Sequence, residues 1–288
     1  MKRQPFFSVI LATKNEEKNI SRCIDSLLKQ TYPKENFEII LVDNNSTDKT
    51  RDFARTKIRF VYNLPTISPI KSVKNFRGAQ VNWAMKKSRG EAIFFPDADM
   101  TFNKNLLTEA AKLIEEKDFD ALYIPEKIVR KGWFGKIRNF ERSFYNQTCI
   151  DAIRIVRKRI FENVGGFDEK RIYFGPDDWD LNKRIKNITD NISITHNKLF
   201  HHEEDLTLHN YLIKKSVYTN TFDSYIKKWG KNDSDIKKQF GFFYRYIGVF
   251  IENGKWKEIV RHPILAIGMI SLRFAVGLVY LYKRLSSK

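Results

Sequence analysis

Two aspartates placed directly after an apolar run are the first feature of this sequence that can do chemistry. Asp97 and Asp99 are separated by one alanine and follow the run 92–95, and Asp43 ends an earlier apolar run. Hard divalent cations prefer carboxylate oxygens and keep positions open for water and substrate phosphates. Such carboxylates also cap helices, so the Asp-X-Asp pair indicates a metal site only when its surroundings agree.

A second pair of acids, Asp177 and Asp178, stands just before Trp179 at the start of a predicted helix. Acids at a helix start complement the helix dipole, so this pair carries little information alone. A carboxylate within hydrogen-bond reach of a hydroxyl also accepts its proton. What strengthens both pairs is their order along the chain and the strands that precede them.

Apolar strands and amphipathic helices alternate through the first 125 residues. Buried strands are predicted at 6–11, 37–42, 58–62, 92–95 and 121–124. This alternation predicts an α/β fold, with a mostly parallel sheet covered by helices on both faces. Ligands bind beyond the carboxyl ends of the strands in such sheets, and Asp43, Asp97 and Asp99 all fall there.

The pattern loosens after residue 125. We expect strands at 149–156 and 192–195 and a helix from 176 to about 188, followed by a basic and aromatic helical stretch. The predicted organisation is a catalytic domain at 1–205, a helical extension at 206–262 and a hydrophobic C-terminal segment at 263–288.

The positive charge of the chain is concentrated near its apolar C-terminal segment. The formal net charge is +18, and residues 208–288 hold 15 Lys/Arg against 5 Asp/Glu. Residues 264–282 contain one charge, Arg273, and as a helix they would be about 28 Å long, close to the thickness of a bilayer core. Basic residues beside an apolar helix indicate an anionic membrane surface, and the alternative is a buried helix of a soluble protein.

The N-terminal residues lack the long apolar stretch of a signal peptide, and the two cysteines cannot form a disulfide framework. We therefore expect the protein at the cytoplasmic side of the cell membrane, peripheral or anchored by a single segment. Whether 264–282 spans the membrane or lies in its plane stays open.

Six motifs, taken in order, resemble family 2 glycosyltransferases, which have the GT-A fold. The resemblance covers residues 6 to about 205 and implies inverting transfer from a nucleotide-diphosphate sugar with a divalent metal, Mn²⁺ or Mg²⁺. The motifs are Ser8–Glu16, Leu27–Tyr32, Ile40–Asp48, Phe95–Asp99, Val164–Glu169 and Pro176–Leu181.

The resemblance also implies roles for individual residues. Asp178 matches the general base, and Asp177 stands where the family usually has Glu. Asp99 matches the direct metal ligand, with His202 favoured over His201 as a further contact. The expected donor-binding residues are Ala12, Asn15, Asp43, Asn44, Arg77 and Asp97. Independently of the resemblance, the candidate acceptor residues are Trp133, Phe134, Asp177 and Trp179. For Trp133 and Phe134, contact with lipid or a packed aromatic corner stays open.

Other functions fit the sequence less well. The basic excess is C-terminal and no RNA-binding signature is visible, so we expect no nucleic-acid partner. No Gly-X-Gly-X-X-Gly follows the first strand, which argues against a dinucleotide-dependent oxidoreductase. The expected partners are a nucleotide sugar, UDP-linked by preference, a lipid-linked or glycan acceptor, and a membrane surface. A catalytically silent glycosyltransferase-like scaffold stays as the alternative.

Overall fold

A twisted sheet of seven strands forms the centre of the protein in a computed structural model, which describes residues 4–64, 77–172, 175–218 and 221–286. The strand order is β3-β2-β1-β4-β8-β6-β9. These strands are β1 (Phe7–Thr13), β2 (Phe37–Asp43), β3 (Phe60–Asn63), β4 (Ala92–Phe94), β6 (Ala121–Tyr123), β8 (Ile153–Arg157) and β9 (Ile192–Ile194).

The strands are mostly parallel, as the sequence predicts. β1 pairs in parallel with β2 and β4, whereas β8 runs antiparallel to both β4 and β6. The strand predicted at 149–156 begins only at Ile153, because residues 145–152 form turns. Every residue of β2 is buried, which explains why its central residues 39–42 are all apolar rather than alternating.

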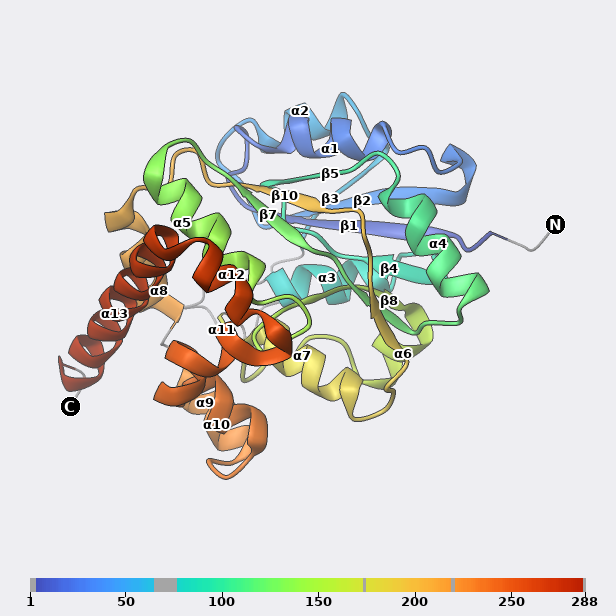
Figure 1. Ribbon diagram of the computed structural model, residues 1–288. Coiled ribbons are helices and arrows are strands. Elements are labelled where there is room, and N and C mark those ends of the chain that lie inside the picture. Colours follow the sequence, from blue (N-terminus) through green and yellow to red (C-terminus); the bar gives the residue numbers. More distant parts are fainter. Residues whose placement is uncertain (1–3, 65–76, 173–174, 219–220, 287–288) are drawn as a thin grey trace.

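Helices cover both faces of the sheet (Figure 1). Successive side chains of a strand point to opposite faces, so Val9 and Leu11 join one core layer and Ile10 joins the other. The first layer is completed by α1 (Ile20–Leu28) and α4 (Leu106–Glu116). The second is completed by α3 (Arg77–Met85), α6 (Lys158–Asn163) and α7 (Asp177–Lys186), and the short helices η1 (Lys34–Asn36) and α2 (Thr50–Arg55) flank β2.

A second sheet of three strands, which the sequence analysis did not predict, lies beside the first. Its order is β5-β10-β7, made of β5 (Met100–Phe102), β10 (Leu199–His202) and β7 (Glu126–Val129). β10 is antiparallel to β5 and parallel to β7. Because β5 begins directly after Asp99, this sheet fixes one side of the Asp-X-Asp turn.

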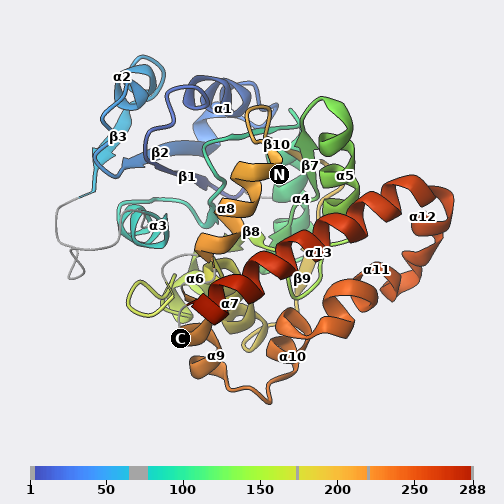
Figure 2. The same ribbon diagram turned by 90° about the vertical axis from the view of Figure 1, so that its left-hand side faces the viewer.

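The C-terminal elements pack onto the sheet through α5 (Gly132–Ser143), as Figure 2 shows for α13. Phe140 and Phe144 of α5 share a hydrophobic cluster with Phe250 and Met269. The elements are α8 (Leu208–Tyr218), α9 (Phe222–Trp229), α10 (Ser234–Phe240), the π-helix η3 (Tyr244–Gly248), α11 (Val249–Ile251), η4 (Glu252–Gly254), α12 (Trp256–Arg261) and α13 (Pro263–Ser286).

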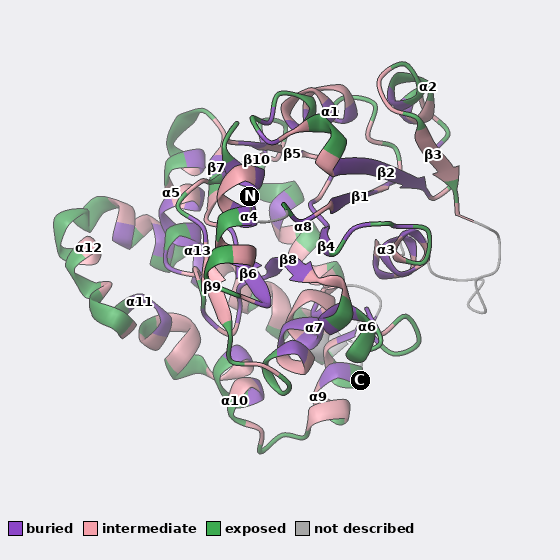
Figure 3. Cartoon of the chain, turned by 90° about the vertical axis from the view of Figure 1, so that its right-hand side faces the viewer, coloured by how far each residue is buried: buried purple, intermediate pink, exposed green. Residues whose placement is uncertain are grey.

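Helix α13 contains the apolar segment found in the sequence, and by length and composition it is a candidate membrane helix. One side of α13 packs against α5 and α8, where Arg273 is buried and its guanidinium lies 3.4 Å from the Glu141 carboxylate. The opposite side of α13 carries exposed apolar residues, whereas a central strand such as β2 is buried along its whole length (Figure 3). We call this side the apolar stripe, and it consists of Ile264, Ile267, Ile270, Phe274, Leu278, Leu281 and Leu285.

Candidate active site

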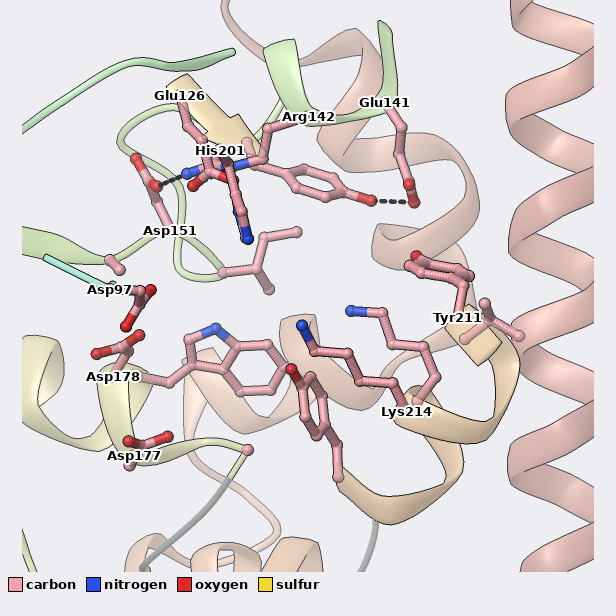
Figure 4. Close-up of a pocket in the computed structure, with 18 of the residues that line it drawn as sticks. Asp97, Glu126, Glu141, Arg142, Asp151, Asp177, Asp178, His201, Tyr211 and Lys214 are labelled. Carbon is pink, nitrogen blue, oxygen red and sulfur yellow. Dashed lines mark hydrogen bonds and ion pairs between the residues drawn. The ribbon is translucent and has the colours of Figure 1, made fainter. Parts of the chain in front are cut away.

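A cavity of about 560 Å³ opens at the carboxyl ends of β1 and β4 and extends under the C-terminal helices (Figure 4). The predicted residues Ala12, Arg77, Asp97, Asp99 and Asp178 all line it. They come from separate segments of the chain, so the fold brings together most of the side chains that the motifs singled out.

Asp97 lies just beyond the carboxyl end of β4, where it forms ion pairs with two arginines. An isolated parallel bridge joins Asp97 to Ala12 and so extends the pairing of β1 with β4. The Asp97 carboxylate lies 2.6 Å from Arg77 Nε and 3.3 Å from Arg154 Nη1. Burial raises the pKa of Asp97, but these two cations outweigh it and hold the pKa at about 2. Asp97 is therefore ionised at neutral pH.

Arg77 also connects Asp97 to the second acidic pair. Its Nη1 donates a hydrogen bond of 3.0 Å to the Asp178 carboxylate, and its Nη2 donates to the Phe95 carbonyl. Asp177 Oδ2 lies 3.9 Å from the same guanidinium. Burial and the negative charge of Asp178 raise the pKa of Asp177 to about 7.

Asp99 lies beside His201 rather than beside His202. The His201 Nε2 atom is 3.1 Å from Asp99 Oδ2, and its Nδ1 atom is 2.8 Å from Glu126 Oε1. Burial disfavours the charged imidazole, but Asp99 and Glu126 outweigh it and raise the pKa of His201 to about 10. Among the described residues Asp99 Oδ1 is buried without a hydrogen-bond partner.

This arrangement fits a divalent cation. A cation beside Asp99 would satisfy the unpaired oxygen and replace the proton that His201 otherwise carries. Within the described part of the chain no group of three or more His, Cys, Asp or Glu side chains is assembled for a metal. The protein would therefore supply only a few of the metal ligands, as expected when substrate phosphates complete the coordination.

The preference for His202 does not agree with the structure. His202 forms hydrogen bonds with Thr101 and Glu204, both on the side of β10 away from Asp99. Successive residues of a strand face opposite ways, so only one of the two histidines can face Asp99. The 3.1 Å contact between His201 Nε2 and Asp99 Oδ2 identifies His201 as the histidine whose ring lies beside Asp99.

Three predicted donor-binding residues, Asn15, Asp43 and Asn44, do not line the cavity. Asp43 is fully buried, and it accepts hydrogen bonds from the Ser46 backbone nitrogen and from the hydroxyls of Ser46 and Thr13. Asp43 therefore shapes the turn after β2 in this structure. The direct nucleoside contact stays a prediction that requires this turn to open.

The four candidate acceptor residues divide into two pairs. Asp177 and Trp179 line the cavity, and Trp179 stacks on Phe222 with a centroid distance of 6.3 Å. Trp133 and Phe134 do not line it: Trp133 is half exposed on α5, and Phe134 packs edge-on against Tyr211. The pair on α5 is therefore not part of the cavity wall.

Several cavity residues were not found by the sequence analysis. Arg154 contacts Asp97, Glu126 contacts His201, and Lys214 points into the cavity from α8 (Figure 4). Arg154 had a visible signal, because it is a charged residue among the apolar residues at the start of strand β8. Glu126 and Lys214 had none, since their positions depend on how distant segments pack.

An open α/β sheet with acidic residues at the carboxyl ends of its strands, beside a cavity lined by many charged side chains, is the arrangement expected of a nucleotide-diphospho-sugar transferase. The family model described as "Glycosyl transferase family 2" matches residues 8–165, more than half of the chain. The chain belongs to this family, and its α/β fold is the GT-A fold that the motifs imply.

The chain is similar to several characterised proteins. It is 40% identical to the poly(ribitol-phosphate) beta-N-acetylglucosaminyltransferase TarS of Staphylococcus aureus over 154 residues. The aligned residues make up 54% of this chain and 25% of TarS. The chain thus spans about a quarter of that relative's length.

Solved structures share the fold at lower identity. The mannosyltransferase PcManGT of Pyrobaculum calidifontis, in complex with GDP-Man and Mn²⁺, has a TM-score of 0.65 at 18% identity, covering 98% of this chain and 88% of PcManGT. TarS residues 1–349 in complex with UDP have a TM-score of 0.57 at 22% identity, covering 96% of this chain and 88% of that one.

Proposed function

We propose that the chain is an inverting glycosyltransferase that moves a sugar from a nucleotide-diphosphate sugar, UDP-linked by preference, to an acceptor hydroxyl on a lipid-linked or cell-surface glycan. The observation that supports this proposal is that the guanidinium of Arg77 contacts both Asp97 and Asp178 in the wall of one cavity. Displacement at a sugar carbon needs donor and base held in a fixed relation, and such positioning lowers the barrier substantially.

The proposed reaction is a single displacement. The acceptor oxygen bonds to the anomeric carbon as the bond from that carbon to the diphosphate breaks, and the diphosphate leaves with the electron pair. The acceptor proton passes to the Asp178 carboxylate, which Arg77 orients through its 3.0 Å hydrogen bond. A divalent ion, held by Asp99 with His201 beside it, would neutralise charge on the leaving diphosphate when bound.

Donor binding is the first prediction. We expect Mn²⁺ together with one of UDP, GDP, CDP or dTDP to raise the Tm of the full chain by about 5 °C at roughly 100 times the Kd, and UDP to be that nucleotide. Mn²⁺ alone and each nucleotide alone are the controls. No shift with any nucleotide at saturating concentration would contradict the proposed function. A shift without release of UDP from UDP-sugars, whatever glycan acceptor is offered, would favour the silent scaffold.

We further propose that the protein binds a membrane surface through the apolar stripe of α13, with the helix lying in the plane of the membrane. A spanning helix is surrounded by lipid, whereas α13 buries Arg273 and Met269 against the rest of the protein. Exposed cations accompany the stripe, among them Lys257 and Arg261 of α12, and the aromatic Trp256 is half exposed. Such a combination is typical of interfacial helices.

The second prediction tests this placement. We expect the chain to float with preformed vesicles of 70% phosphatidylcholine and 30% phosphatidylglycerol, and the triple variant Ile267→Glu, Phe274→Glu, Leu278→Glu to lose more than 10-fold in vesicle affinity. The matched control is Phe53→Glu with Ile188→Glu, which changes exposed apolar residues elsewhere. Retention of vesicle binding by the triple variant would contradict an in-plane contact through the stripe.

A further inference from the structure

Three cations line the cavity on the side formed by the C-terminal helices. Lys214 and Lys215 lie on α8 and Arg245 lies on the π-helix η3, and we call these residues the cation cluster. Within the described part of the chain no carboxylate oxygen lies within 4.0 Å of their side-chain nitrogens. Lys215 instead packs its ammonium group over the rings of Tyr211 and Tyr218, at 5.2 and 5.1 Å.

The nearby carboxylates are already used by other partners. Glu141 is bonded to Arg138 at 2.7 Å, to the Tyr145 hydroxyl at 2.6 Å and to Arg273 at 3.4 Å. Glu203 is bonded to Arg138 at 3.0 Å. These acids are paired with buried arginines, so neither of them forms an ion pair with Lys215 or Arg245.

The positive charges of Lys215 and Arg245 are costly in these surroundings, whereas Tyr218 and nearby acids raise the pKa of Lys214. Burial and the charge of Arg138 lower the pKa of Lys215 to about 7. Burial and the charge of Arg273 lower the pKa of Arg245 to about 10. Like charges held together in a partly dry cavity are stabilised by an anion that binds among them.

The cluster is divided between the donor end of the cavity and its inner end. Lys214 points into the middle of the cavity (Figure 4), and its charge acts on Asp99 and Asp97. Lys215 and Arg245 interact instead with Glu141 and with each other. The anion that suits Lys215 and Arg245 is thus different from the donor diphosphate at Asp99.

The inner end of the cavity also adjoins α13. Val276, Gly277 and Tyr280 of α13 line the cavity, and the apolar stripe lies on another side of the same helix. A molecule whose head group binds at the inner end could therefore extend an apolar chain or a polymer from the cavity along α13. This places the surplus charge where an acceptor would enter, opposite the donor.

We propose that Lys215 and Arg245, with Lys214 between them and the donor, bind a phosphate group carried by the acceptor. This inference rests on the proposed function and adds the chemical class of the acceptor. Guanidinium groups bind phosphate oxygens in a bidentate manner, and an ammonium group contributes a compact charge, so the pair suits a phosphate ester.

The test is calorimetric titration of the full chain with three probes. Octyl phosphate represents a lipid phosphate, glycerol 3-phosphate represents a polyol phosphate, and octyl glucoside is the uncharged control. The double variant Lys215→Gln, Arg245→Gln is compared with Lys237→Gln, an exposed cation of α10 outside the cavity. Arg245→Lys, which keeps the charge, serves if the double variant does not fold, and UDP with Mn²⁺ is titrated into each variant.

We expect at least a 10-fold weaker affinity for the phosphate probe in the double variant, with affinities for UDP and octyl glucoside unchanged within twofold. Tighter binding of octyl phosphate assigns the phosphate to a lipid, and tighter binding of glycerol 3-phosphate assigns it to a polyol. The proposal is overturned if wild type binds neither phosphate, if the double variant binds them normally, or if UDP affinity falls equally. Failure of the proposed function gives a different result, namely no UDP binding by wild type.

Discussion

Asp178→Asn is expected to lower the rate of sugar transfer by roughly 10²- to 10⁴-fold while leaving donor binding nearly unchanged. The amide has the shape of the carboxylate but cannot take the acceptor proton. Arg77 keeps its contacts to Asp97 and to the Phe95 carbonyl, so the donor end of the site should stay in place. The measurement is release of nucleotide diphosphate in the presence of acceptor, together with the Kd for the nucleotide.

Two other variants make this prediction specific. Asp190→Asn changes an exposed acid that does not line the cavity and should behave like wild type. Asp177→Asn removes the neighbouring acid, whose pKa is raised to about 7, and we expect a smaller loss of activity than for Asp178→Asn. If Asp178→Asn kept more than a tenth of the activity while Asp177→Asn lost it, the base would be Asp177.

The central sheet was predictable because its signals are local. Strands β1, β2 and β4 are short apolar runs bounded by turns, and their burial on both faces follows from the helices that alternate with them. The Asp-X-Asp turn could be located for the same reason, since it directly follows β4. Asp97 and Asp99 line the cavity as this reasoning requires.

What could not be predicted depends on contacts between distant segments. The small sheet joins β5 with β10, about 100 residues later, and so brings both histidines to the end of β5 that follows Asp99. The sequence offered two adjacent histidines and no information on which way each points. The helical N-terminus of α5 likewise places Trp133 outside the cavity, although its neighbouring glycines resemble a loop.

The apolar C-terminal segment illustrates a third kind of difficulty. Its composition predicts a helix, but the same composition suits a spanning helix, an interfacial helix and a core helix. The deciding residue is Arg273, which looks like a cost to membrane insertion in the sequence. In the structure its guanidinium pairs with Glu141 of α5, and this contact holds one side of α13 against the protein.

Asp99→Asn is expected to abolish the dependence of nucleotide binding on Mn²⁺ and to lower the transfer rate by roughly 10³-fold. The buried Oδ1 atom without a partner is the oxygen that a cation would use, and an amide at this position is a much weaker ligand. The measurement is the increase in nucleotide affinity produced by Mn²⁺, compared between the variant and wild type, with transfer activity measured beside it. An unchanged Mn²⁺ effect would exclude Asp99 as a ligand.

Substitutions of the two adjacent histidines provide a matched test and control for this prediction. His201→Gln should weaken the Mn²⁺ effect by roughly 10- to 100-fold, since the ring is 3.1 Å from Asp99 and is oriented by Glu126. His202→Gln should leave the Mn²⁺ effect unchanged, because that ring is bonded to Thr101 and Glu204 on the other face of β10. The opposite result would mean that β10 shifts by one residue when the donor binds, since only such a shift exchanges the faces of the two side chains.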